Sequence, residues 1–257
     1  MIDYHMHSIL SDGNNTYEEM ILAGIEKGLD EIGLTDHVCL KMVPWAVAPV
    51  DLPVMTAQIL ELRDKYSKKI KVRYGIEMDY FPGREDEIES IINSLPLDYV
   101  IGSVHFIGDW NFDGDQSFYG KWSNDELYNI YFELVQLAAK SQLFDIIGHI
   151  DVIKKFRIYP ESDQSRLFEN TIRVIGENNM TVELNTGGLD RACNEFYPGP
   201  AVLKQCFLQK VPVTLSSDAH QSKQVYRHAE SALTMLRETG FRELATFSRR
   251  KRSAIRI

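Results

Sequence analysis

Histidine and carboxylate side chains recur where short apolar runs of this 257-residue chain end. Six of the seven histidines occupy such positions, and three carboxylates join them. Imidazole nitrogen combined with carboxylate oxygen is the ligand set of Zn, Mn and Fe. Nine candidates exceed the needs of one ion, so we expect two or three divalent transition-metal ions, with Glu77 bridging. The candidate ligands are His5, His7, Asp12, His37, Glu77, His105, His149, Asp218 and His220.

The spacing of these residues indicates that different strands supply them. Positions 7, 37, 77, 105 and 149 are separated by 30, 40, 28 and 44 residues, and each interval is about one strand-plus-helix unit. His5 and His7 are two residues apart, so on a strand both side chains point to the same side and can hold one cation.

Seven apolar runs are interpreted as strands that alternate with helices, which predicts parallel pairing. Because nearly every run contributes a candidate ligand, we expect an α/β fold of one domain over residues 1–257. Its form would be a closed or nearly closed seven-stranded (β/α)7 TIM-like barrel with the active site at the C-terminal strand ends. A doubly wound open sheet is the alternative. The runs are Ile2–His7, Glu31–His37, Val72–Asp79, Tyr99–Phe106, Phe144–Asp151, Thr181–Thr186 and Val211–His220.

Helix signals fill the intervals between these runs. Two capping boxes, Thr16 with Glu19 and Ser123 with Glu126, predict helix starts. Proline and glycine mark other boundaries. They predict helix starts at Asp51–Pro53 and Pro200, a helix over Ile88–Leu95, a stop at Gly28, and a helix from near Lys223 to Gly240.

Each candidate ligand also has a plain structural interpretation. Asp12 could belong to a turn, and Asp218 with His220 could cap a helix. Glu77 is harder to explain in this way, because an unpaired carboxylate in an apolar strand is costly. The joint pattern of residue types at strand ends favours a metal site with several ions. His228 lies in a helical segment and is interpreted as a surface or packing residue.

The overall composition narrows the classes of partner. The formal net charge of −9 and the pI of about 5.3 disfavour nucleic-acid and membrane-surface binding. Three cysteines without a CxxC motif are expected to be reduced packing residues, and the N-terminus does not resemble a signal peptide. We therefore expect a cytoplasmic protein. The acidic balance does not exclude a small anionic substrate, because metal ions can supply positive charge locally. Nothing in the sequence specifies an oligomeric state.

The candidate ligands, taken together with the segments GLTDH, GSVHFI and GHIDVIKKF, resemble the PHP (polymerase and histidinol phosphatase) superfamily, and the PHP-type histidinol phosphatases in particular. The resemblance runs from residue 5 to residue 220, and some relatives have His where this chain has Asp12. It implies a distorted seven-stranded barrel and three metals. The implied ligand sets are His5, His7, Glu77 and Asp218; Glu77, His105 and His149; and Asp12, His37 and His220.

The resemblance implies a metal-dependent phosphomonoesterase that hydrolyses L-histidinol phosphate in histidine biosynthesis. The expected mechanism is in-line attack by a metal-bridging hydroxide, with Glu77 central and with Asp218, His220 or a metal-bound water protonating the leaving group. Alternatives are another PHP phosphoesterase acting on a nucleotide or phosphotyrosine, an amidohydrolase, and a non-catalytic metal-binding module. No lysine occupies the place of an amidohydrolase's bridging carboxylated lysine, and a dead site would not need nine ligands.

A cluster of three cations follows His149. In this cluster Arg157 is expected to clamp the phosphate, because its planar guanidinium can hold two phosphoryl oxygens at once. Lys154 and Lys155 add charge to the same segment, and a solvated basic surface is the alternative interpretation. Ser103, which stands two residues before His105, is a second candidate for phosphate binding.

Overall fold

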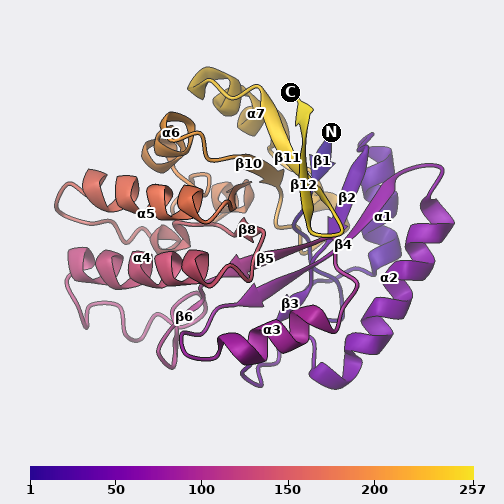
Figure 1. Cartoon of the computed structure of the whole chain (residues 1–257), viewed down its shortest axis with the longest axis horizontal. Helices are drawn as coiled ribbons and strands as arrows, with labels where there is room; N and C mark the ends of the chain where they lie inside the picture. Colours follow the sequence, from indigo (N-terminus) through magenta and orange to yellow (C-terminus); the bar gives the residue numbers. More distant parts are fainter.

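The apolar runs pair side by side as parallel strands in the computed structural model, which describes residues 1–257. Neighbours follow the order β1-β2-β4-β5-β8-β9-β10, and helices surround the strands (Figure 1). The strands are almost wholly buried, as expected where helices cover a parallel sheet. Their bounds are β1 (Ile2–Asp3), β2 (Glu31–Leu34), β4 (Lys71–Asp79), β5 (Tyr99–Ser103), β8 (Ile146–Ile147), β9 (Thr181–Asn185) and β10 (Val213–Ser216).

The first and last strands meet, which brings the sheet close to a complete ring. Tyr4 N donates to Leu215 O at 3.3 Å, and Ala219 N donates to His5 O at 3.2 Å. His7 N returns a bond to Ala219 O at 2.8 Å. The expected seven-stranded barrel is therefore confirmed, and the open doubly wound sheet is not what forms.

Most observed strands are shorter than the expected runs, and two of the runs also change course. The run Glu31–His37 divides into β2 and β3 (His37–Val38), both paired with β4. The run Phe144–Asp151 keeps only Ile146–Ile147 as a strand. Beyond it the main chain turns toward a side chain instead of a neighbouring strand, since His149 N donates to Glu183 Oε2 at 2.6 Å. The residues that leave the strand therefore include His149, one of the candidate ligands.

Seven α-helices form the outer layer, and both expected capping boxes are present. The last helix begins at Ala229 rather than near Lys223, because Tyr226 and His228 adopt positive φ angles of 60° and 55° that no α-helix can contain. The helices are α1 (Tyr17–Glu26), α2 (Leu52–Tyr66), α3 (Glu85–Asn93), α4 (Asn124–Ser141), α5 (Ser165–Glu177), α6 (Pro200–Leu208) and α7 (Ala229–Thr239). Short 3-10 helices are η1 (Pro49–Asp51), η2 (Val152–Lys154), η3 (Gly187–Asp190) and η4 (Ser222–Gln224).

An antiparallel hairpin that the sequence did not predict covers the amino-terminal end of the barrel. It consists of β11 (Glu243–Ser248) and β12 (Lys251–Arg256), drawn in yellow in Figure 1. Arg250 Nη2 donates to Leu143 O at 2.7 Å, and Arg252 Nη1 donates to Asn179 O at 2.8 Å. These carbonyls lie just before β8 and β9. The hairpin therefore closes this end, while the carboxyl ends of the strands remain at the opposite end.

One continuous cluster of buried apolar side chains runs from Ile2 to Phe247. None of the helices is both long enough and apolar enough to traverse a lipid bilayer. The cysteines are free and buried, as expected for packing residues: Cys39, Cys193 and Cys206.

Candidate metal centre

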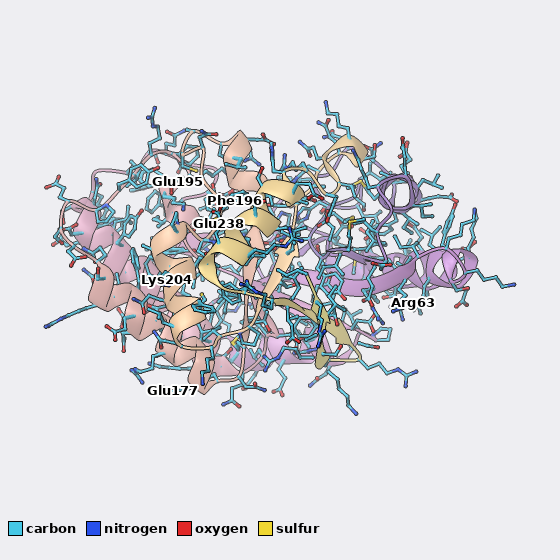
Figure 2. All side chains as sticks on the ribbon, turned by 90° about the horizontal axis from the view of Figure 1, so that it is seen from above. Arg63, Glu177, Glu195, Phe196, Lys204 and Glu238 are labelled. Atoms are coloured by element: carbon cyan, nitrogen blue, oxygen red, sulfur yellow. The ribbon has the colours of Figure 1, made fainter.

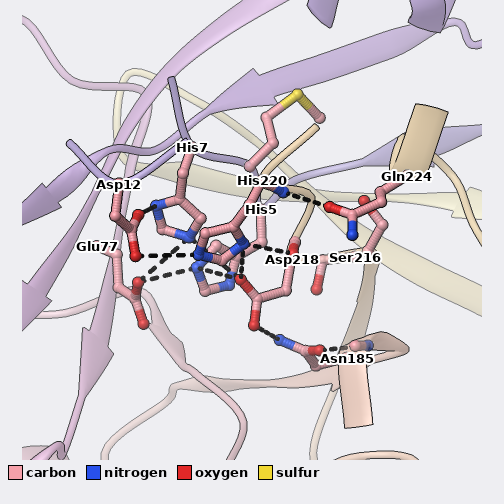
Figure 3. Close-up of polar contacts among 12 residues, drawn as sticks. His5, His7, Asp12, Glu77, Asn185, Ser216, Asp218, His220 and Gln224 are labelled. Carbon is pink, nitrogen blue, oxygen red and sulfur yellow. Dashed lines mark hydrogen bonds and ion pairs between the residues drawn. The ribbon is translucent and has the colours of Figure 1, made fainter. Parts of the chain in front are cut away.

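All nine expected ligands converge at the carboxyl ends of the strands. They come from β3, β4 and from segments that directly follow β1, β5, β8 and β10, so the parallel order of the barrel brings them together. Figure 3 shows six of them as one cluster of rings and carboxylates. The nine are His5, His7, Asp12, His37, Glu77, His105, His149, Asp218 and His220.

Glu77 lies at the middle of this cluster, and its two oxygens face different histidines. Glu77 Oε2 is 2.8 Å from His37 Nδ1 and 3.0 Å from His5 Nε2. Glu77 Oε1 is 2.8 Å from His149 Nε2 and 3.6 Å from His105 Nε2. This arrangement is typical of a carboxylate shared between two cations.

Asp12 gathers a second group nearer to solvent. Its carboxylate is 3.2 Å from His220 Nε2, 3.7 Å from His37 Nε2 and 4.0 Å from His7 Nδ1. The expected ligand sets assigned His7 and His37 to one ion each. In the structure each of these rings faces two groups of ligand atoms.

Unpaired buried atoms show that the cluster fits cations. His5 Nε2 and Glu77 Oε2 are buried and lie 3.0 Å apart, yet neither atom makes a hydrogen bond to the other or to any other group. Buried polar atoms without a partner are costly and rare, and a cation that accepts both as ligands removes the cost. The donor set of imidazole and carboxylate matches divalent transition metals.

The charges of the ligands also suit a cation. Burial would raise the pKa of Glu77, but the neighbouring His37 and His5 outweigh it and hold the pKa well below its usual range. For Asp218, burial is likewise outweighed by His5 and by the hydrogen bond to His7, so its pKa is also well below normal. Both groups are ionised near neutral pH and can act as ligands.

The histidines titrate in opposite directions. Burial lowers the pKa of His5, but the Glu183 and Glu77 carboxylates more than compensate and raise it well above 6.5. Burial and the neighbouring His37 and His220 rings lower the pKa of His7 to about 4. His7 is therefore neutral at physiological pH, which is the form that binds a metal.

Two carboxylates that the sequence analysis missed hold ligand rings in place. Glu183 Oε1 is 2.6 Å from His5 Nδ1, and Asp79 Oδ1 is 2.9 Å from His105 Nδ1. Bonds of this kind fix ring orientation and leave Nε2 for the metal. The sequence did contain a signal for Glu183, because it is a carboxylate within the apolar strand β9. The same observation in β4 identified Glu77 as a candidate ligand.

Hydrogen bonds from neighbouring side chains fix the conformation of the loop after β10. Asp218 has a positive φ of 52°, an uncommon conformation for a residue other than glycine. Asn185 Nδ2 donates to Asp218 Oδ2 at 3.3 Å, and the main-chain N of His220 donates to Gln224 Oε1 at 2.9 Å (Figure 3). These contacts turn both candidate ligands toward the cluster.

A cavity of about 330 Å³ opens over the cluster, a size suited to a small molecule. Trp45 and Asp113 line it from the loops before α2 and α4. Lys155 and Arg191 are its cationic lining residues. The cavity can therefore bind an anionic group beside the candidate ligands.

The structure does not bring Arg157 to this cavity. Arg157 is exposed and does not line it, because the chain after η2 turns outward through a positive φ of 65° at Arg157 itself. Lys154 is buried and bonds Asp151, Glu195 and the Phe196 carbonyl at 2.8, 3.0 and 2.8 Å (Figure 2 labels Glu195 and Phe196). Of the three expected cations, only Lys155 reaches the cavity.

Ser103 and His228 also have defined places. Ser103 is buried below the cluster, and its hydroxyl donates to Glu77 Oε1 at 2.6 Å, so it supports a ligand rather than lining the cavity. His228 is partly exposed at the start of α7 and lies 3.0 Å from Asp190, as expected for a surface residue.

Comparisons with known proteins identify the relatives of this arrangement. Residues 3–187 match the family model of the PHP domain. A probable histidinol-phosphatase of Deinococcus radiodurans is 32% identical over 258 residues, covering 98% of each chain. The crystal structure of histidinol phosphate phosphatase from Lactococcus lactis, complexed with zinc, L-histidinol and phosphate, superposes with a TM-score of 0.85 at 28% identity, again over 98% of each chain.

Proposed function

This chain belongs to the PHP domain family, and from that premise we propose that it is a metal-dependent phosphatase that hydrolyses L-histidinol phosphate to L-histidinol and phosphate. One observation carries the proposal. Over 98% of the chain, the fold matches that of a relative crystallised with zinc, L-histidinol and phosphate. The cavity of this chain is lined both by candidate metal ligands and by the cations Lys155 and Arg191. The site binds divalent metal ions, and we propose two or three of them, taken from Zn, Mn and Fe.

We propose the following ligand sets. Bound ions would supply the positive charge that activates water near neutral pH and stabilises charge on the phosphoryl oxygens. The first set is His5, His7, Glu77 and Asp218; the second is Glu77, His105 and His149; the third is Asp12, His37 and His220, with His7 and His37 also facing neighbouring sets.

The chain's own residues would bind and orient the substrate. Arg191 and Lys155 line the cavity and can hold phosphoryl oxygens, Arg191 with two parallel hydrogen bonds. Asp218 and His220 also line the cavity and are the two candidates for protonating the leaving alkoxide. Arg191 thus replaces Arg157 as our candidate for the phosphate clamp, and Ser103 becomes a residue that positions Glu77.

A substrate panel tests the function. We expect L-histidinol phosphate to be hydrolysed with a kcat/KM far above that of AMP or phosphotyrosine, and we expect chelation to abolish turnover until Zn, Mn or Fe is returned. A higher kcat/KM for the nucleotide or for phosphotyrosine would identify a different phosphoesterase. Full activity in protein shown by elemental analysis to be metal-free would refute the metal-dependent reaction.

A pair of arginine variants tests the clamp. Arg191→Ala should lower kcat/KM by a factor on the order of 10², about 3 kcal/mol, with unchanged metal content and melting temperature. Arg157→Ala is the matched control and should behave like the parent, because Arg157 does not line the cavity. If kcat/KM instead falls in Arg157→Ala and stays at the parental value in Arg191→Ala, Arg157 is the residue that binds the phosphate.

A further inference from the structure

One carboxylate in the cavity has no place in the metal centre. Four carboxylates line the cavity, and Asp12, Glu77 and Asp218 are candidate ligands. The fourth, Asp113, comes from the loop between β7 (Trp110–Asn111) and α4. It does not belong to any of the three candidate ligand groups.

Asp113 is held by a cation of the same cavity. Lys155 Nζ donates to Asp113 Oδ2 at 2.7 Å and to the Asp113 carbonyl at 3.0 Å. Asp113 Oδ1 accepts no hydrogen bond within the chain, and the side chain is 29% exposed. An ammonium group has three donors, so two are used on Asp113 and one is left for a ligand of Lys155.

The Asp113 carboxylate carries a negative charge at neutral pH. Burial raises its pKa, but Lys155 Nζ, 2.7 Å away, opposes this effect and the pKa lies below its usual range. An ionised oxygen without a partner, on a residue that lines the cavity, is a favourable site for a cationic group of a ligand.

We propose that Asp113 is the residue that binds the ammonium group of the substrate, with its free Oδ1 as acceptor. The inference rests on the proposed function. In L-histidinol phosphate the ammonium-bearing carbon is bonded to the methylene that carries the phosphate ester, so the anion and the cation are close neighbours. Lys155 and Asp113 are in direct contact and offer the complementary pair, Lys155 for the phosphate and Asp113 for the ammonium group. The pair selects aminoalkyl phosphates over phosphates without an amine.

Asp113→Asn and a pair of substrates test this role. One substrate is L-histidinol phosphate, and the other is 3-(imidazol-4-yl)propyl phosphate, which differs only in lacking the amine. Losing a charged hydrogen bond should lower kcat/KM for L-histidinol phosphate about 10-fold or more and leave the amine-free substrate within about 2-fold. Binding of the product L-histidinol, measured by calorimetry, should weaken by a similar factor. Asp113→Glu should recover part of the loss.

The outcomes separate ammonium binding from loop anchoring. Equal losses on both substrates would overturn the proposal and make Asp113 an anchor for its loop through Lys155. Unchanged kinetics on both would overturn it as well. Asp109→Asn is the matched control, since Asp109 is an exposed carboxylate of the neighbouring turn that pairs only with Lys41. If the parent enzyme does not hydrolyse L-histidinol phosphate, the proposed function fails, whereas a normal parent with an unaffected Asp113→Asn variant refutes this inference alone.

Discussion

The candidate ligands form a buried polar cluster that would be unfavourable without added positive charge. Glu77, Glu183 and Asp79 are each at most 1% exposed, and histidines are their only ion-pair partners, with no lysine or arginine among them. In the metal-free chain the histidines must supply the compensating charge by taking up protons. The stability of the metal-free protein is therefore linked to pH.

The sign of this linkage follows from the pKa shifts. Burial opposes protonation of these rings, but nearby carboxylates raise the pKa of five site histidines in the metal-free chain, namely His5, His37, His105, His149 and His220. A raised pKa in the folded state adds stability that is fully present below the unfolded value near 6.5 and is lost as pH rises through the folded value. His7, with its pKa lowered to about 4, has the opposite sign and destabilises the fold only below about pH 6.5.

We therefore expect the metal-free protein to lose on the order of 2 kcal/mol of stability between pH 6 and pH 8, or roughly 5 °C in melting temperature. Differential scanning fluorimetry of stripped protein at several pH values measures the shift. The metal-loaded protein is the control and should change less, because ions replace the protons. A metal-free protein that becomes more stable over this range would contradict the assigned pKa directions.

The ligands were predictable from sequence because each combines a residue type with a strand end. His37, Glu77 and His149 are placed by regular strand–helix alternation, so their convergence follows from the topology. Asp113 and Arg191 lie in irregular segments, whose paths no periodicity specifies. The prediction for Arg157 was wrong for the same reason. Its closeness to His149 in sequence did not place it at the cavity, because the main chain turns outward at its positive φ.

At the scale of elements, close packing between β5 and the segment after β8 determines how Glu77 is held. Gly148 has no room for a side chain, because an added Cβ would lie 2.5 Å from Ser103 Oγ and 2.7 Å from Ile101 Cγ2. Ser103 in turn donates to Glu77 Oε1. A steric change at Gly148 should therefore reach the metal centre through the Ser103 hydroxyl, in addition to any effect on the adjacent candidate ligand His149.

We expect Gly148→Ala to reduce stability by about 1–3 kcal/mol, as overpacking of cores does, and to weaken metal binding through displacement of Ser103. Chemical denaturation and metal content after dialysis measure the two effects. Gly102→Ala is the control, since its Cβ would meet the Phe144 ring at 2.3 Å rather than Ser103. Both variants should be destabilised, but only Gly148→Ala should lose metal. Equal metal retention would show that Ser103 does not position Glu77.

Elements were predictable in proportion to their local signals. The capping boxes at Thr16 and Ser123 gave correct helix starts, because their hydrogen bonds depend on neighbouring residues alone. The β11–β12 hairpin was missed because its turn uses Arg249 and Arg250 at φ of 51° and 61°. Such turns usually contain Asn-Gly or Asp-Gly, so the sequence lacks the usual signal, and contacts with the barrel must compensate.

For the whole molecule, a buried carboxylate joins the first barrel strand to the segment that follows the last one. Asp3 at the end of β1 is 1% exposed and accepts three bonds from the loop after β10. Its Oδ1 accepts from Ser217 N at 2.9 Å, and its Oδ2 accepts from Ser217 Oγ at 2.5 Å and Tyr226 N at 2.7 Å. Asp218 directly follows Ser217, so the contact that joins these two segments also places a candidate ligand.

Asp3→Ala should therefore affect stability and metal binding together. The variant leaves three buried donors without an acceptor, which we expect to cost about 3 kcal/mol of unfolding free energy, and it releases the segment that carries Asp218. Asp3→Asn should lose less, because its carbonyl oxygen can still accept from Ser217 N while its amide cannot accept from Tyr226 N. Asp30→Ala is the control: Asp30 is largely exposed and pairs with the N-terminal amine, so its loss should stay within about 0.5 kcal/mol. Denaturant unfolding and metal analysis provide the measurements. An Asp3→Ala protein with parental stability and full metal content would mean that the strand pairing between Tyr4 and Leu215 closes the barrel without help from this carboxylate.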